Sequence, residues 1–175
     1  MDTGLIHLYT GDGKGKTTAA IGLAARAAGT GMKVVFGQVL KGRATGEVAS
    51  LEALDVKVIR SDKKMGFVWQ MNDEQKEEFK TEQQRLFDEI RDTVVSDPET
   101  GLLVIDEVLD ALSLSLIDEQ QIRDIIETKP VELEVVFTGR AAPEWLIEKA
   151  DYVTEMKKIK HPYDKGVKAR RAIEY

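Results

Sequence analysis

The stretch that decides the fold is Thr10-Gly11-Asp12-Gly13-Lys14-Gly15-Lys16-Thr17-Thr18. It lies between an apolar run at residues 5–9 and an alanine-rich stretch at residues 17–28, which predict a strand and a helix that ends at Gly29 or Gly31. Glycines let the backbone curl so that N–H groups point inward at phosphate oxygens, and the start of the helix adds the positive end of its dipole. The pattern therefore predicts a nucleotide-binding P-loop; the alternative is a structural turn rich in glycine.

Two side chains of this loop have specific expected roles. Lys16 is expected to contact phosphate charge, and the Thr17 hydroxyl is expected to ligate magnesium. The general P-loop pattern has glycine at the position of Thr10, and this chain departs from it there. The candidate nucleotide-binding residues of the loop are Thr10, Gly11, Asp12, Gly13, Lys14, Gly15, Lys16, Thr17 and Thr18.

Short apolar runs alternate with longer amphipathic stretches along the rest of the chain. Strands are predicted at residues 34–36, 56–59, 102–105 and 134–138, and helices at residues 72–95, 119–128 and 143–149, where Pro143 is expected as the first helical residue. This alternation predicts the α/β class, with a mostly parallel sheet flanked by helices in one domain over residues 1–175. Residues 41–49 and 61–71 have weak periodicity and are expected to be long loops at strand ends, where α/β proteins usually build their sites.

One predicted helix carries more detailed signals. Asn72 and Gln75 have the spacing of a capping box, which places the start of the helix. The residues expected on its buried face are Phe79, Leu86, Phe87, Ile90 and Val94.

Composition narrows the class of protein. The chain has 175 residues, of which 42% are hydrophobic and 32% charged, enough apolar sequence for a folded core. Its 25 lysines and arginines against 31 aspartates and glutamates give a net charge of −6, which argues against a protein that coats nucleic acid. The absence of cysteine excludes disulfides, thiolate metal sites and cysteine nucleophiles. No apolar run approaches the roughly 20 residues of a bilayer span, and no signal peptide is visible, so a soluble cytoplasmic protein without a membrane partner is expected.

Two further strand ends carry residues suited to chemistry. The apolar run at residues 102–105 leads into Asp106 and Glu107, as expected of a strand that presents a carboxylate to magnesium or its waters. An aspartate that caps the following helix is the alternative. Arg140 follows a later strand and is a candidate for binding a phosphate group. The alternative is an arginine that is simply solvated at the surface. The candidate metal ligands are thus Thr17, Asp106 and Glu107.

Two segments allow more than one interpretation on their residues alone. Phe67 and Trp69 place two large aromatic side chains in an expected loop, where packing against the core is the alternative to a functional role. The basic tail at residues 157–171 suits solvent, nucleic acid or an anionic ligand.

Taken together, the motifs resemble those of the P-loop ATP:corrinoid adenosyltransferases. Threonine at the position of Thr10 is common in that family. The resemblance extends over nearly the whole chain, and the C-terminal segment is its most specific part. The segments that carry it are residues 9–20, Gln38-Val39-Leu40-Lys41-Gly42, Gly66-Phe67-Val68-Trp69, Asp106-Glu107, and Lys160-His161-Pro162-Tyr163-Asp164-Lys165-Gly166-Val167-Lys168-Ala169 through Tyr175.

The resemblance implies a RecA-like P-loop fold and transfer of the 5′-deoxyadenosyl group of ATP to the cobalt(I) of a reduced corrinoid, in adenosylcobalamin synthesis or salvage. Cobalt would attack the ribose C5′ and the intact triphosphate would leave, with ATP lying in the P-loop in the direction opposite to that in kinases. Backbone N–H donors, a lysine and magnesium that are already arranged around the phosphates would stabilise the negative charge of such a leaving group. Lys16 would then be catalytic, as would Phe67 and Trp69, which would press on the lower corrinoid face and keep an axial ligand off cobalt.

The resemblance also implies the partners of the protein. These are ATP with Mg²⁺, a reduced corrinoid as substrate, a reduced flavoprotein as electron donor and a second copy in a homodimer. Nucleic acid is not expected as a partner, because the chain is acidic overall. The residues by themselves leave two alternatives. One is a P-loop kinase or ATPase acting on another small molecule, with Glu107 positioning the nucleophile. The other is a nucleotide-dependent nucleic-acid-binding module using the basic tail, against which the acidic total and the lack of an evident stacking surface argue.

Overall fold

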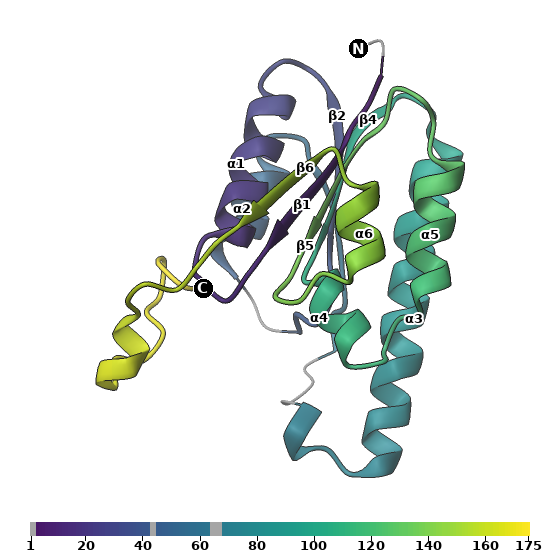
Figure 1. Ribbon diagram of the computed structural model, residues 1–175. Coiled ribbons are helices and arrows are strands. Elements are labelled where there is room, and N and C mark those ends of the chain that lie inside the picture. The colour runs from purple at the N-terminus through teal and green to yellow at the C-terminus, as the bar shows by residue number, and fades with distance from the viewer. Residues whose placement is uncertain (1–2, 43–44, 64–67) are drawn as a thin grey trace.

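A parallel β-sheet forms the centre of the computed structural model, which describes residues 3–42, 45–63 and 68–175 (Figure 1). The order of its six described strands is β3 (Lys57–Arg60), β2 (Lys33–Gln38), β4 (Thr100–Asp106), β5 (Glu134–Thr138), β1 (Ile6–Thr10) and β6 (Tyr152–Glu155). Every neighbouring pair is parallel. The expected α/β class with a mostly parallel sheet is therefore confirmed.

Helices cover both faces of this sheet (Figure 1). One face carries α1 (Lys16–Ala28) and α2 (Gly46–Glu52), and the other carries α3 (Asp73–Ser96), α4 (Val108–Ser113), α5 (Glu119–Thr128) and α6 (Glu144–Lys149). The short 3-10 helices η1 (Val68–Gln70) and η2 (Pro162–Lys165) complete the described elements. Parallel strands need crossover connections of this kind, because a tight turn cannot join two strands that run the same way.

The strands contribute to two cores, because successive side chains of a strand point to opposite faces of the sheet. In β4, Leu103 and Ile105 belong to the core shared with α3 and α5, whereas Leu102 and Val104 belong to the core shared with α1. All four side chains are almost completely buried. The central strands are therefore continuous apolar runs, as a sheet covered on both faces requires.

Helix α3 begins and packs as its sequence predicts. The Gln75 N–H donates to Asn72 Oδ1 at 2.8 Å, and the Asn72 N–H donates to Gln75 Oε1 at 3.0 Å, which completes the capping box. The five side chains expected on the buried face are all buried. The helix approaches β2 closely at Gly37, where a Cβ would lie 2.4 Å from Cδ1 of Ile90. A glycine inside this strand thus marks the point of closest helix–sheet contact.

Some expectations about local structure are wrong. The loop expected at residues 41–49 ends early, because α2 begins at Gly46; only Leu51 of this helix is buried, so no periodic apolar face marks it. Helix α4 was not predicted, since its apolar residues continue the run of β4. Strand β6 was not predicted either, because all four of its residues are exposed and show no alternation. Pro143 caps α6 instead of being its first residue.

The carboxyl ends of the parallel strands lie at one edge of the sheet, and the P-loop follows β1 at this edge. After β6 the chain continues as a largely exposed tail over residues 157–175, the yellow segment of Figure 1. None of the helices in the described ranges combines the length and the apolar character needed to cross a bilayer.

Candidate functional site

The P-loop joins β1 to α1 and curls around the side chain of Lys16. Gly15, the residue before α1, has a φ of 127°, a backbone conformation that only glycine adopts readily. The Lys16 ammonium donates to the carbonyls of Gly11 at 2.6 Å and Gly13 at 2.7 Å. Burial lowers the pKa of Lys16, and the charge of Asp110 opposes that shift. The loop therefore holds a partly buried positive charge at the N-terminal end of a helix, an arrangement suited to anions.

Thr17, in the first turn of α1, faces Asp106 at the end of β4. Its hydroxyl donates to Asp106 Oδ1 at 2.9 Å, and the hydroxyl of Thr138 donates to the same oxygen at 2.7 Å. Asp106 is completely buried, so its carboxylate depends on such donors for its stability. The three residues meet because β1, β5 and β4 are neighbours in the sheet and their carboxyl ends lie side by side.

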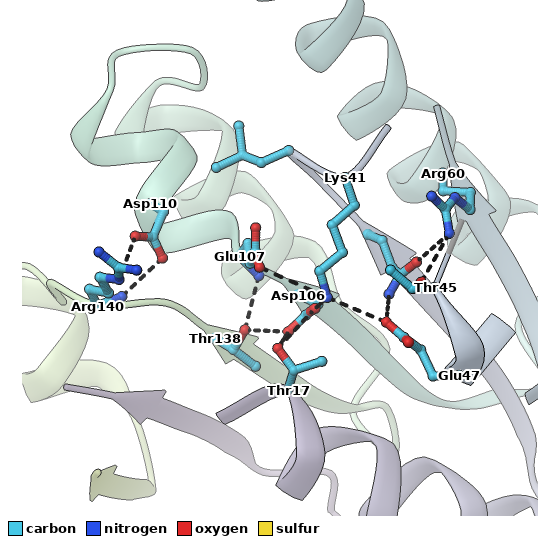
Figure 2. Close-up of polar contacts among 12 residues, drawn as sticks. Thr17, Lys41, Thr45, Glu47, Arg60, Asp106, Glu107, Asp110, Thr138 and Arg140 are labelled. Atoms are coloured by element: carbon cyan, nitrogen blue, oxygen red, sulfur yellow. Dashed lines mark hydrogen bonds and ion pairs between the residues drawn. The ribbon is translucent and has the colours of Figure 1, made fainter. Parts of the chain in front are cut away.

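The ammonium of Lys41 lies against the other oxygen of Asp106, 2.6 Å from Oδ2 (Figure 2). It is also 3.5 Å from Glu47 Oε1 and 3.9 Å from Glu107 Oε1, and the side chain is only 16% exposed. Burial lowers the pKa of Lys41, but the charges of Asp106 and Glu107 outweigh that effect, and the pKa is raised overall. Lys41 is therefore a cation at neutral pH and the shared counter-ion of three carboxylates.

Glu107 has a strained backbone between β4 and α4. Its φ of 64° and ψ of 14° lie in the left-handed region, which costs free energy for a residue other than glycine. Its N–H donates to Thr138 Oγ1 at 2.9 Å. Burial raises the pKa of Glu107 to about 7, while Lys41 opposes the rise. The strained turn thus places a second, more basic carboxylate beside Asp106.

Arg140 lies at the same edge of the sheet, after β5, and its side chain is 76% exposed. Its Nε is 3.8 Å from Asp110 Oδ1, and its backbone N–H donates to Asp110 Oδ2 at 3.1 Å (Figure 2). The structure therefore brings the predicted phosphate-binding arginine to the P-loop edge, with its guanidinium accessible to solvent.

The start of the P-loop is tied to neighbouring segments through its backbone. The Thr10 hydroxyl and the Gly11 N–H donate to the carbonyl of Arg140, at 3.0 and 3.1 Å. The Gly13 N–H donates to the carbonyl of Met156 at 2.6 Å, and a Cβ on Gly13 would lie 2.6 Å from that same oxygen. Glycine is therefore required where the loop passes the chain that follows β6.

Three other predicted nucleotide-binding residues do not face the carboxylates. Asp12 Oδ1 accepts from the backbone N–H of Lys158 at 2.9 Å, and the Lys14 ammonium donates to the carbonyl of Ile173 at 3.2 Å. Thr18 is exposed on α1. The side chains of Asp12 and Lys14 thus contact the C-terminal tail, whereas Lys16 and Thr17 are turned into the loop and toward Asp106.

A chain of polar contacts extends the site toward β2 and β3 (Figure 2). The side-chain amide of Gln38 donates to Glu47 Oε1 at 2.9 Å. Arg60 donates to Gln38 Oε1 and to Thr45 Oγ1, both at 3.2 Å. These contacts hold the carboxylate of Glu47 beside Lys41.

The side chains of the predicted aromatic pair, Phe67 and Trp69, lie outside the part of the chain that the structure describes. Phe67 lies outside the described residues, and of Trp69 only the backbone, in η1, is described. Their predicted contact with a corrinoid stays a prediction.

The oxygen atoms at and around Asp106 are suited to bind a hard divalent cation as ligands. The carboxylates of Asp106 and Glu107 and the hydroxyl of Thr17 are ligands of the kind that Mg²⁺ prefers. Within the described ranges, no three side chains of His, Cys, Asp or Glu gather as a metal-binding group. A cation here would take its remaining ligands from water and phosphate, as Mg²⁺ commonly does.

Three residues of this edge were missing from the predicted site: Lys41, Thr138 and Asp110. Thr138 is the last residue of β5, and Lys41 follows the end of β2 by three residues. Inspection of every carboxyl end of the predicted parallel strands would have identified both. Asp110 lies in the unpredicted helix α4, so no comparable signal marks it.

Comparison with known proteins decides the family. The profile of the family described as ATP:corrinoid adenosyltransferase BtuR/CobO/CobP matches residues 2–175. The chain belongs to this family. A corrinoid adenosyltransferase of Pseudomonas aeruginosa is 36% identical over 175 residues, which cover 99% of this chain and 85% of that protein. A corrinoid adenosyltransferase of Escherichia coli is 33% identical over 177 residues, covering 99% of this chain and 87% of the relative. The family implied by the sequence motifs is thereby confirmed.

A likeness to a solved structure concerns the fold alone. ATPases 2 and 3 of EssC from Geobacillus thermodenitrificans match with a TM-score of 0.50 and 14% identity. The match covers 97% of this chain and 35% of that chain. Together with the parallel sheet and its P-loop, it confirms the expected RecA-like fold of this family member.

Proposed function

We propose that the chain transfers the 5′-deoxyadenosyl group of ATP to the cobalt(I) of a reduced corrinoid and releases triphosphate, in adenosylcobalamin synthesis or salvage. The observation that carries this proposal is the family match over residues 2–175, in a chain whose P-loop residue Thr17 faces the buried Asp106. In this proposal residues 1–175 act as one adenosyltransferase domain. The kinase or ATPase alternative is not favoured, because the family is one of adenosyltransferases.

In the proposed reaction, the negative charge that must be stabilised develops on the leaving triphosphate. Cobalt(I) donates an electron pair to C5′ of the ribose, and the cobalt–carbon bond forms as the bond from C5′ to the bridging oxygen of the α-phosphate breaks. The electron pair of the broken bond leaves with the triphosphate, so negative charge grows on phosphate oxygens. Lys16 and the N–H groups at the start of α1 bind that charge, and they favour the transition state because the charge is larger there.

The residues around Asp106 serve the same leaving group. Thr17, Asp106 and Glu107 are the side chains that would hold magnesium, and the ion supplies charge neutralisation to the departing triphosphate when it is bound. Thr138 orients the Asp106 carboxylate through its hydroxyl. Arg140 adds a second, solvent-accessible cation for phosphate at this edge.

The remaining P-loop residues shape the backbone cradle. Gly11, Gly13 and Gly15 allow the loop to curl, and Thr10 ties its start to the chain after β5. We propose that ATP lies reversed in this cradle, with C5′ toward the corrinoid, as the resemblance to the family implies.

Phe67 and Trp69 are proposed to press on the lower face of the corrinoid. Cobalt without a lower axial ligand is easier to reduce, so the aromatic pair would act in reduction and not in acid–base chemistry. The support is the resemblance of the Gly66–Trp69 segment to the family motif. A reduced flavoprotein donor and a homodimer are proposed from the resemblance to the family as a whole. A cytoplasmic location is proposed from the cysteine-free composition, which fits a reducing compartment.

The aromatic proposal predicts where the loss of activity falls. Phe67→Ala and Trp69→Ala should slow adenosylation most when cobalt(II) must be reduced on the enzyme, while ATP binding stays close to that of the wild type. Rates are compared with cobalt(II) plus reductant and with chemically prepared cobalt(I). Equal losses in the two assays would contradict a role in reduction, and unfolding of both variants would favour plain packing.

The proposed function itself is tested by absorption spectroscopy. The chain is mixed with ATP, magnesium and a chemically reduced cobalt(I) corrinoid under exclusion of oxygen. We expect the cobalt(I) spectrum to give way to that of an alkylated product that light cleaves, and we expect Asp106→Asn to slow the change strongly. Persistence of unalkylated cobalt in the presence of bound ATP would contradict the proposal.

A further inference from the structure

Both oxygens of the Asp106 carboxylate already accept hydrogen bonds, from three donors within the described residues. Its Oδ1 accepts from Thr17 at 2.9 Å and from Thr138 at 2.7 Å, and its Oδ2 accepts from Lys41 at 2.6 Å and from Thr17 at 3.2 Å. The single hydroxyl hydrogen of Thr17 is shared between the two oxygens, so three donors meet about four lone-pair positions. A cation that ligates Oδ2 must therefore approach the oxygen that the Lys41 ammonium already contacts.

Lys41 is the donor that conflicts most with a metal. The two threonine hydroxyls are neutral, and the Thr17 oxygen can turn to ligate the cation itself. Thr138 is held in place, because it also accepts from the Glu107 N–H at 2.9 Å. The Lys41 ammonium carries a full positive charge against the same oxygen and repels a divalent cation at short range.

The backbone before Lys41 is built to hold that ammonium in position. Val39 donates its N–H to the carbonyl of Asp106 at 3.2 Å. Leu40 has a φ of 62°, and its N–H donates to Oε1 of Gln83, a nearly fully buried side chain of α3, at 2.8 Å. A strained residue fixed by a buried partner thus aims the next side chain at Asp106, which argues for a specific role.

We propose that Lys41 is a positioning residue that occupies the metal-binding carboxylate until magnesium arrives together with nucleotide. The inference rests on the proposed magnesium–ATP site. A bare dication repels the ammonium from Asp106 and brings no new anion, so of its described partners only Glu47 and Glu107 remain to pair with it, and Glu107 is itself a candidate metal ligand. A dication bound to triphosphate brings anionic oxygens with which the ammonium can pair. Lys41 therefore couples the entry of the metal to the entry of ATP.

The experiment measures metal binding to the nucleotide-free protein, with Mn²⁺ as the probe and electron paramagnetic resonance as the readout. Wild type should bind Mn²⁺ weakly, and Lys41→Met should bind it about tenfold more tightly or better, because the competing charge is gone. Lys41→Arg keeps the charge and should behave as wild type. Lys33→Met is the matched control, since Lys33 pairs with Asp97 at 3.3 Å at the amino end of β2.

A second titration includes ATP. Wild type should gain Mn²⁺ affinity when ATP is present, and the gain should be clearly smaller for Lys41→Met. Equal Mn²⁺ affinities of wild type and Lys41→Met without nucleotide, with ATP binding intact, would overturn the role of Lys41 alone. Failure of wild type to bind ATP at all would count against the proposed function instead.

Folding of the variant is followed by circular dichroism, because Lys41→Met leaves three carboxylates without their ammonium. If it does not fold in metal-free buffer, the double variant Lys41→Met/Glu47→Gln takes its place in the titration. That variant removes one neighbouring negative charge and keeps Thr17 and Asp106. Tighter Mn²⁺ binding than in Glu47→Gln alone supports the proposal, and equal binding overturns it.

Discussion

At the scale of the residue, each buried charge of the candidate site is paired with polar or oppositely charged groups. The buried carboxylate of Asp106 is held by two hydroxyls and one ammonium, and Lys16 is held by carbonyls of its own loop. Lys16 and Asp106 are thus oriented before a ligand arrives, which favours electrostatic catalysis, whereas Lys41 is the group proposed to move when a metal enters. The P-loop and Asp106 could be predicted from the sequence because each belongs to a local pattern. Lys41 follows the end of a predicted strand and could have been identified as a candidate on that ground, but its contact with Asp106 appears only when β2 and β4 lie side by side.

Lys16 gives the most direct prediction for a single residue. Lys16→Ala should lower the rate of adenosylation by about a hundredfold or more, since it removes the fixed positive charge that meets the leaving triphosphate. Steady-state rates with magnesium and ATP check this, with Lys33→Ala at the opposite edge of the sheet as a control expected to be unchanged. A Lys16→Ala rate close to the wild-type rate would show that the P-loop assignment is wrong.

Glu82 on α3 gives a prediction about stability and pH. Hydrogen bonds from Arg85, at 3.0 and 3.2 Å, hold the pKa of Glu82 down at about 2, and the Ser61 hydroxyl adds to this at 2.7 Å. Because the folded-state pKa lies below the unfolded value, the stabilisation is fully present above about pH 5 and is lost as the pH falls toward 2.

The variant Glu82→Gln should therefore be about 2 kcal/mol less stable than wild type at pH 7, and the difference should shrink toward pH 2–3. Glu89→Gln is the matched control: Glu89 also pairs with Arg85, at 2.9 Å, but it is half exposed, so its loss should cost about 0.5 kcal/mol or less. Urea unfolding at several pH values provides the free energies of unfolding. A difference that does not change with pH would contradict this account.

At the scale of the element, the sequence is most informative where burial is strong. The predicted bounds of α5 and β5 agree with the structure, and the capping box places the start of α3 correctly, because these elements carry periodic apolar faces or a local capping signal. Helix α2 buries only Leu51, and β6 buries nothing, so neither leaves such a pattern. Two of the missed elements therefore pack weakly on the sheet, whereas a third, α4, is well buried but continues the apolar run of β4 without a break in pattern.

The contact between α3 and β2 is tested at Gly37. Gly37→Ala should cost about 1–3 kcal/mol of stability, because the new Cβ would overlap the side chain of Ile90 in a packed core. Gly22→Ala is the opposite control: nothing lies within 4 Å of a Cβ on this exposed residue of α1, and the change should stabilise the helix by about 0.5–1 kcal/mol. Thermal unfolding compares the two. A neutral Gly37→Ala would mean that α3 does not pack against β2 as closely as described.

At the scale of the whole molecule, strand order creates the site. The sheet brings the ends of β1, β5, β4 and β2 together, so residues from distant parts of the sequence meet at one edge. The tail returns to the same edge near its end, where the carbonyl of Ile173 accepts from the Lys14 ammonium. The general position of this edge follows from the parallel α/β pattern. The contacts across it depend on strand order and on the return of the tail, which no local pattern in the sequence specifies.

The identity of the phosphate product tests the central claim most directly. Attack at C5′ releases all three phosphates as one molecule, whereas attack at the terminal phosphorus leaves ADP. The same P-loop would serve both reactions, since both place growing charge on phosphate oxygens. With a reduced corrinoid, magnesium and ATP, we expect triphosphate in a one-to-one ratio to the alkylated, light-sensitive cobalt product, measured by phosphorus nuclear magnetic resonance and absorption. ADP and inorganic phosphate as the corrinoid-dependent products, without alkylated cobalt, would contradict the account.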